Sequence, residues 1–248
     1  MMDVELLSCD WCGQGWSCWT AEPLKQHLPD SPGVVRISDG REILSITDLD
    51  SLAKGMGYIL RKLGREGLLI SHLATDLPRN DRKGLRDFLR WQHRLSTGHS
   101  PTLDFGEGEG TAPLSPCGGM EDARWMSLDW SEWMPFDLPT VSRLPRGAGA
   151  YRVIDVRRRE LVIVGATKDL ASTLRGKGRK GWRFSNLNLA FAPLEATGAK
   201  ALAEVQCDLV GGYYLAHSRS PRFQFGRWSK RGMDDLRLFI VSNHPDLL

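Results

Sequence analysis

The chain has 248 residues, of which 41% are hydrophobic, so it is long enough to form the core of one large domain or two small ones. Its first eight residues include Asp3 and Glu5 and lack both a basic lead and a long apolar run. We therefore expect no signal peptide, no membrane span and a cytoplasmic location, in which the five cysteines stay reduced. Residues 1–118 carry 13 basic and 16 acidic side chains, whereas residues 119–248 carry 20 and 14, so the second half suits a polyanionic partner.

An internal repeat organises the chain. The pattern Trp-Ser-x-Trp at 16–19 returns at 130–133, and each copy is followed by a proline-containing segment and an arginine-bearing apolar strand. Each copy also ends on a Phe-Gly pair, Phe105-Gly106 and Phe225-Gly226. Several landmarks in one order at a nearly constant offset predict a tandem duplication, with units near 16–106 and 130–226.

The first unit shows a hairpin, a helix, a strand and a second helix. Short apolar runs near 34–37 and 41–44 predict the hairpin, and the helices are expected at 49–63 and 82–95, with a strand at 68–73 between them. The acidic, Gly-rich and Pro-rich stretch that follows is expected to link the units. The domains are therefore 1–106, a linker at 107–123, and 124–248.

The second unit repeats this order. Two β-branched runs, Tyr151–Ile154 and Leu161–Val164, flank a charged turn and predict a hairpin. A helix carrying Leu170 and Leu174 follows, then a strand at 187–194 and a helix at about 200–210 that is expected to stop at Gly211-Gly212. The predicted fold is α+β, with two tandem small domains, each a three-stranded, mostly antiparallel sheet flanked by helices.

A Gly-x-Tyr strand, a strand ending in Gly and then a helix resemble the opening of the GIY-YIG nuclease domain. Gly149 and Tyr151 match its first motif, Gly165 matches the glycine of the second, and Glu204 matches the glutamate that holds a divalent metal. The resemblance implies a metal-dependent endonuclease that cleaves phosphodiester bonds. Glu204 would hold Mg2+ or Mn2+, Tyr151 would position or activate water, and Arg175, Lys177 or Arg183 would stabilise the phosphate charge.

Other positions depart from that family pattern. Ile163 stands where the second motif has its Tyr, and Thr173 stands at the helix Arg position. The first unit keeps only an acid, Asp87, where Val35, Ser45 and Gly55 fill the other positions, so we interpret it as degenerate. Two alternatives to a nuclease therefore stay open: a catalytically inactive nucleic-acid-binding module, and a protein-interaction module built from the two units.

Basic side chains cluster in the second unit. Cations, glycines and a Trp in residues 175–183 suit contact with a nucleic-acid backbone, DNA rather than RNA, although a solvated basic surface would show the same pattern. The nucleic-acid-binding candidates are Arg157, Arg158, Arg159, Lys177, Arg179, Lys180, Trp182, Arg183 and Arg222.

Three cysteines lie in the N-terminal lead. Cys9 and Cys12 are separated by two residues, and Cys18 follows. Zinc is one interpretation of this group. The spacing after Cys12 is unusual for a zinc ribbon or finger, so we favour thiols packed beside the neighbouring tryptophans.

Overall fold

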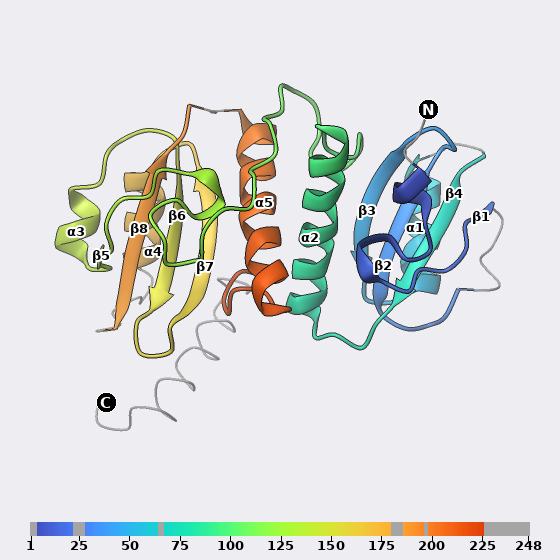
Figure 1. Ribbon diagram of the computed structural model, residues 1–248, viewed down its shortest axis with the longest axis horizontal. Helices are drawn as coiled ribbons and strands as arrows, with labels where there is room; N and C mark the ends of the chain where they lie inside the picture. Colours follow the sequence, from blue (N-terminus) through green and yellow to red (C-terminus); the bar gives the residue numbers. More distant parts are fainter. Residues whose placement is uncertain (1–3, 22–27, 64–66, 180–185, 196–197, 226–248) are drawn as a thin grey trace.

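In a computed structural model, two similar units lie on either side of a central pair of helices (Figure 1). The structure describes residues 4–21, 28–63, 67–179, 186–195 and 198–225. Among these residues, no helix is both long and apolar enough to cross a membrane.

The first unit forms a sheet with strand order β1-β4-β2-β3, and every pair in it is antiparallel. Two short 3₁₀ turns, Val4–Leu7 and Trp11–Gly13, precede it. Its strands and helices are β1 (Thr20–Ala21), β2 (Gly33–Ser38), β3 (Ile43–Leu49), α1 (Leu52–Leu63), β4 (Leu69–Ala74) and α2 (Arg79–Thr97).

The second unit repeats this topology with strand order β5-β8-β6-β7, again antiparallel throughout. The 3₁₀ turn Trp125–Ser127 and the short helix α3 (Leu138–Ser142) precede the long strands of this sheet. Its other elements are β5 (Met134–Pro135), β6 (Gly149–Asp155), β7 (Glu160–Thr167), α4 (Leu170–Arg179), β8 (Leu187–Pro193) and α5 (Ala199–His217).

The α+β class is confirmed, but the prediction of three strands in each sheet is wrong. We call the Trp-rich segments at 4–21 and 118–135 the leads of the two units. Each lead adds a two-residue edge strand, β1 against β4 and β5 against β8. These strands are too short to show the alternation of apolar and polar residues by which a strand is recognised in a sequence.

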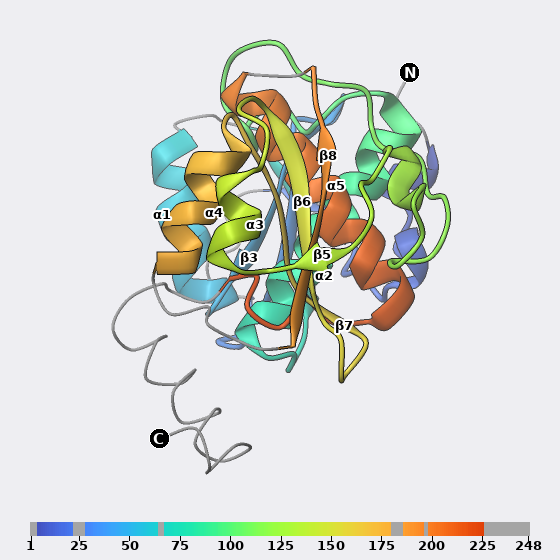
Figure 2. The same ribbon diagram turned by 90° about the vertical axis from the view of Figure 1, so that its left-hand side faces the viewer.

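Helices cover both faces of each sheet. In the second unit, Tyr151 and Val153 pack with Leu170 and Leu174 of α4 in one apolar cluster. The alternate residues of β6, such as Ala150, pack with α5 in a second apolar cluster, because successive residues of a strand point to opposite faces. Figure 2 shows α4 and α5 on opposite sides of β6 and β8.

Helices α2 and α5 pack against each other in opposite directions, and this contact joins the two units. Gly211 allows the close approach, because a Cβ on it would lie 3.0 Å from Cβ of Trp91 in α2. A Cβ on Gly212 would lie 2.2 Å from Sδ of Met126, in the 3₁₀ turn of the second unit. The prediction that these glycines end the helix is therefore wrong. Helix α5 continues to His217, because Gly211 makes room for α2 and Gly212 makes room for Met126.

Candidate functional site

Tyr151 is a core residue of β6. Its side chain is 4% exposed, and its partner across the hairpin is Gly165. A Cβ on Gly165 would lie 2.5 Å from the Tyr151 hydroxyl oxygen, so the glycine leaves room for the ring. Burial raises the pKa of Tyr151 above its ordinary value, which keeps the hydroxyl protonated.

Glu204 lies on the other side of the sheet from Tyr151. It projects from α5 toward α2, whereas Tyr151 packs under α4. Arg175 is half-buried on α4, and Ile163 is buried at the second motif position. Thr173 shares a hydrogen bond of 2.7 Å with Thr167. The structure therefore does not bring the predicted catalytic residues Tyr151 and Glu204 together.

The Glu204 carboxylate is occupied by protein partners. Its Oε1 accepts a hydrogen bond from Ser100 Oγ at 2.6 Å, and its Oε2 accepts one from the Thr111 amide at 2.7 Å. Oε2 also lies 2.9 Å from a guanidinium nitrogen of Arg94 on α2, and the side chain is 2% exposed. Burial alone would raise the pKa of Glu204, but these hydrogen bonds and the Arg94 charge lower it.

Arg94 also holds a second carboxylate. Its Nε donates to Asp208 Oδ1 at 3.0 Å, and both side chains are fully buried. Burial raises the pKa of Asp208 to about 7, although Arg94 and the Leu114 amide oppose the shift. The Arg94 guanidinium thus forms ion pairs with two carboxylates of the other unit. This buried cluster connects the two units and is not an open site.

The residues around Glu204 do not fit the divalent metal that the GIY-YIG resemblance implies. A hard cation takes several oxygen ligands, often including water, whereas both Glu204 oxygens accept hydrogen bonds inside the protein and Oε2 also pairs with the Arg94 guanidinium. Among the residues that the structure describes, no three His, Cys, Asp or Glu side chains form a group able to hold a metal ion.

The correspondence between Glu204 and Asp87 is wrong by one helical turn. Helices α2 and α5 both have 19 residues and end at left-handed residues, Gly98 and Ser218. This register aligns Glu204 with Gly84, and Asp87 with Cys207. The glutamate and its arginine thus have no charged counterparts in the other half of the interface.

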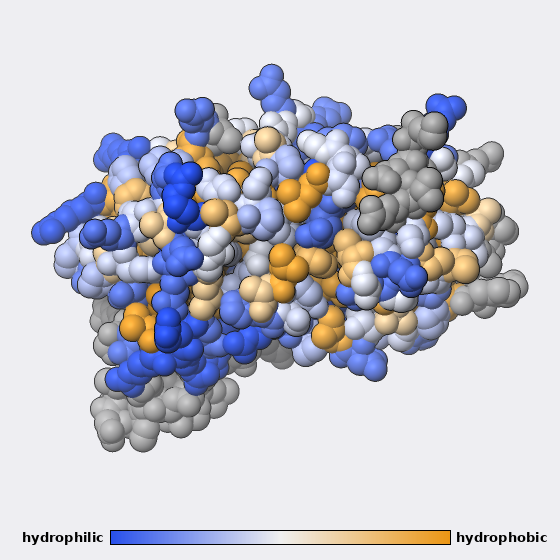
Figure 3. Space-filling model, viewed as in Figure 1, coloured by the Kyte–Doolittle hydropathy of each residue, from blue (hydrophilic) through white to orange (hydrophobic). Residues whose placement is uncertain are grey.

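Eight of the nine predicted nucleic-acid-binding residues fall into three groups, and the ninth, Arg222, lines a pocket. Arg157, Arg158 and Arg159 are exposed at the β6–β7 turn, where Arg159 pairs with Glu121 at 3.1 Å. Figure 3 shows strongly hydrophilic side chains gathered over this end of the hairpin. Lys177 and Arg179 belong to the last turn of α4, and nothing is described of their side chains. Lys180, Trp182 and Arg183 lie outside the described residues.

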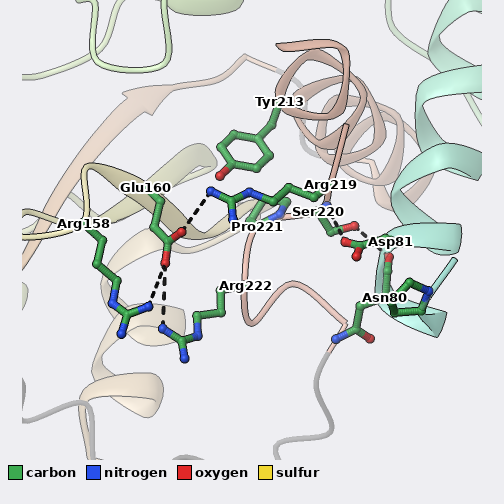
Figure 4. Close-up of a pocket in the computed structure, with 10 residues that line it drawn as sticks. Asn80, Asp81, Arg158, Glu160, Tyr213, Arg219, Ser220, Pro221 and Arg222 are labelled. Atoms are coloured by element: carbon green, nitrogen blue, oxygen red, sulfur yellow. Dashed lines mark hydrogen bonds and ion pairs between the residues drawn. The ribbon is translucent and has the colours of Figure 1, made fainter. Parts of the chain in front are cut away.

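A pocket of about 320 Å³ opens where the two units meet. Arg158 reaches it from the β6–β7 turn, and Arg219 and Arg222 reach it from the segment after α5, so that three guanidinium groups surround Glu160 (Figure 4). Their nitrogens lie 3.9, 3.1 and 3.8 Å from the Glu160 carboxylate, in that order.

The rest of the pocket wall comes from α5 and the start of α2. Tyr213 points its hydroxyl toward Arg219, and Asn80 stands on the opposite side (Figure 4). Asp81 accepts a hydrogen bond from the Ser220 amide at 2.9 Å, which ties α2 to the segment after α5. Burial lowers the pKa of Arg222, and the nearby Arg158 charge lowers it further. The arginines thus crowd one another around a single central carboxylate.

Sequence reasoning found Arg158 and Arg222 but missed their association with Glu160 and Tyr213. At the positions of Arg219 and Arg222 the first unit carries His99 and Thr102, so the repeat contains part of the missed signal. Positions at which only one copy is basic are candidates for a function that the fold itself does not require.

Each unit also contains an arginine enclosed by three tryptophans. The Arg36 guanidinium lies 5.4, 4.1 and 4.8 Å from the rings of Trp11, Trp16 and Trp19. Its terminal nitrogens donate to the carbonyls of Leu6 and Ser8. We call these two groups the Trp–Arg clusters.

The second Trp–Arg cluster is equivalent. Arg152 lies 5.7, 4.4 and 4.6 Å from the rings of Trp125, Trp130 and Trp133. Trp11 and Trp125 were missed as repeat landmarks, although extending the repeat five residues upstream would have found them. Because both units keep this cluster in the core, we assign it to folding.

The cysteines of the first lead are close to one another. Cys9 and Cys18 are exposed, and their sulfur atoms lie 3.9 Å apart. Cys12 is half-buried in the 3₁₀ turn between them.

Comparison of the chain with protein-family models, with curated proteins and with solved structures gave no match.

Proposed function

We propose that the chain is a catalytically inactive nucleic-acid-binding protein that binds the phosphate backbone, of DNA rather than RNA, at the pocket between its units. The observation that carries this proposal is the convergence of Arg158, Arg219 and Arg222 on Glu160. Guanidinium groups bind phosphate through paired N–H donors, which makes arginine suited to this ligand.

The electrostatics of the pocket favour an anionic ligand. Its lining residues include three guanidinium groups and two carboxylates, and Asp81 already accepts a backbone hydrogen bond. Glu160 holds two of the arginines at 3.8 and 3.9 Å, which are loose contacts for ion pairs. A phosphate oxygen could approach these guanidinium groups and make shorter hydrogen bonds than Glu160 does.

We propose that the protein is catalytically inactive because the residues of the nuclease motif make structural contacts and do not share one site. Glu204 is bound by Arg94, Ser100 and Thr111, and Tyr151 is buried on the opposite face of the sheet. A cytoplasmic location belongs to the same proposal, since a reducing compartment suits exposed cysteines.

Salt-dependent titration of labelled DNA and RNA, read by fluorescence anisotropy, tests the proposal. We expect Arg158→Ala, Arg219→Ala and Arg222→Ala each to weaken binding about tenfold and to reduce the salt slope by about 1, because each removes one phosphate contact. Arg41→Ala is the matched control, since this exposed arginine belongs to the corresponding turn of the first unit.

Two results would overturn the proposal. One is the absence of salt-dependent binding. The other is an equal loss of affinity in Arg41→Ala and in the pocket variants, which would assign binding to general surface charge. Tighter binding of RNA than of DNA would correct the choice of nucleic acid.

A further inference from the structure

The leads of the two units form the same turn from different residues. The Cys9 carbonyl accepts a hydrogen bond from the Trp16 amide at 2.8 Å, and the Ala123 carbonyl accepts one from Trp130 at 2.9 Å. Both turns contain a left-handed residue other than glycine, Cys12 with φ 57° and Met126 with φ 54°. The backbone of the two leads is therefore equivalent.

Three cysteines distinguish the first lead from the second. Cys9, Cys12 and Cys18 correspond to Ala123, Met126 and Glu132. Because the second unit makes the same turn and the same Trp–Arg cluster without a thiol at any of these three positions, packing does not require the thiols. Their presence in one copy points to chemistry rather than to folding.

The geometry brings two of the exposed thiols within reach of each other. The sulfur atoms of Cys9 and Cys18 lie 3.9 Å apart, and both residues are exposed to a soluble oxidant. A disulfide bond is about 2.05 Å long, so side-chain rotation has little distance to close. The hydrogen bond from Trp16 to Cys9 already brings the two ends of this segment together.

We propose that Cys9 and Cys18 form a reversible disulfide when the protein meets a small disulfide oxidant such as oxidised glutathione. One cysteine thiolate attacks the oxidant, forms a mixed disulfide and releases one oxidant thiol. The second cysteine attacks that mixed disulfide and releases the other thiol. Two cysteine thiols lose two electrons and two protons in all, and one oxidant disulfide becomes two thiols.

The bond would close a loop around Trp11 and Trp16, two of the rings that contact Arg36. Oxidation would therefore fasten the N-terminal lead over the first Trp–Arg cluster. The second unit has no equivalent thiols in its lead, so this control would act on one unit alone.

Thiol mapping of the reduced full-length protein, after equilibration with oxidised glutathione and acid quenching, tests the inference. Cleavage before Asp10 separates Cys9 from the other two cysteines of the lead, so mass spectrometry can detect a linked pair of fragments. We expect an internal disulfide in the wild type and in Cys12→Ser, and none in Cys9→Ser or Cys18→Ser.

A transplanted pair supplies the positive control for the geometry. In a Cys9→Ser, Cys18→Ser background, Ala123→Cys with Glu132→Cys should form the corresponding disulfide in the second lead. Failure of the wild type to oxidise, a stable glutathione adduct as the end product, or loss of the bond in Cys12→Ser would each overturn the inference. None of these results bears on nucleic-acid binding at the pocket.

Discussion

The two units share a framework and differ in the groups placed on it. Both have the same sheet order, the same lead turn and an arginine among three tryptophans. The first unit adds exposed thiols, whereas the second adds three arginines around Glu160. Features present in both copies are those that the fold needs. Features present in one copy are where functional roles are to be sought.

The same comparison explains the interface between the units. On one side Arg94 pairs with Asp208, and at the equivalent place Tyr214 stacks on Phe88 with ring centroids 5.8 Å apart. Likewise Ser100 bonds to Glu204, whereas its counterpart Ser220 lies against Gly84. Charged contacts on one side of the interface thus correspond to largely apolar contacts at the equivalent positions on the other side.

The largest effect is expected from breaking the charged side. Arg94→Ala leaves Glu204 and Asp208 buried without their cation, so the free energy of unfolding should fall by about 3–5 kcal/mol. Urea unfolding measures this loss. A change below about 1 kcal/mol would show that the cluster is not desolvated as the structure describes.

Copying the apolar side supplies the control for that variant. The combined changes Arg94→Tyr, Asp208→Phe and Glu204→Gly reproduce the residues found at Tyr214, Phe88 and Gly84. We expect this variant to be more stable than Arg94→Ala, because it leaves none of the three charges of this cluster buried. Equal destabilisation of the two would contradict the equivalence of the two sides.

A smaller effect concerns pH. The folded-state pKa of Asp208 is raised to about 7, above the ordinary Asp value of about 3.9, so folded protein holds this proton more tightly than unfolded protein does. The resulting stability is fully present below about pH 4 and is lost as pH rises through about 7.

Asp208→Asn removes this titration while keeping the side-chain size. Between about pH 5 and pH 7, the stability of the wild type relative to the variant should fall by about 1.4 kcal/mol per pH unit. Urea unfolding of both proteins across that range measures the difference. His93, whose pKa burial lowers to about 4, titrates in both proteins and therefore cancels. A constant difference would mean that Asp208 is ionised throughout.

Much of the fold was predictable because it depends on local patterns. The hairpins, the helices and the duplication follow from β-branched runs, helical spacing and repeated landmarks. The edge strands were missed because two residues carry no periodic signal. The length of α5 was misjudged because Gly211 and Gly212 serve contacts with Trp91 and Met126 that are remote in sequence.

The candidate site was less predictable, since it depends on which face each residue occupies. The sequence places Tyr151 and Glu204 in the expected elements but does not show that the sheet lies between them. It also gives no sign that Glu204 meets Arg94, which lies more than a hundred residues earlier in the chain. Arg158 and Arg222 were predicted as binding residues from the clustering of basic side chains, which can be seen in the sequence without knowledge of the fold.

Incubation of end-labelled DNA with the wild-type protein at constant ionic strength, with EDTA or with Mg2+ or Mn2+, tests the central claim most directly. Band mobility reports binding, and denaturing gels report DNA length. We predict equal binding in both conditions and full-length DNA throughout, because Glu204 is held by Arg94, Ser100 and Thr111. Metal-dependent shortening of the DNA that is lost in Glu204→Gln would contradict the account and restore the nuclease.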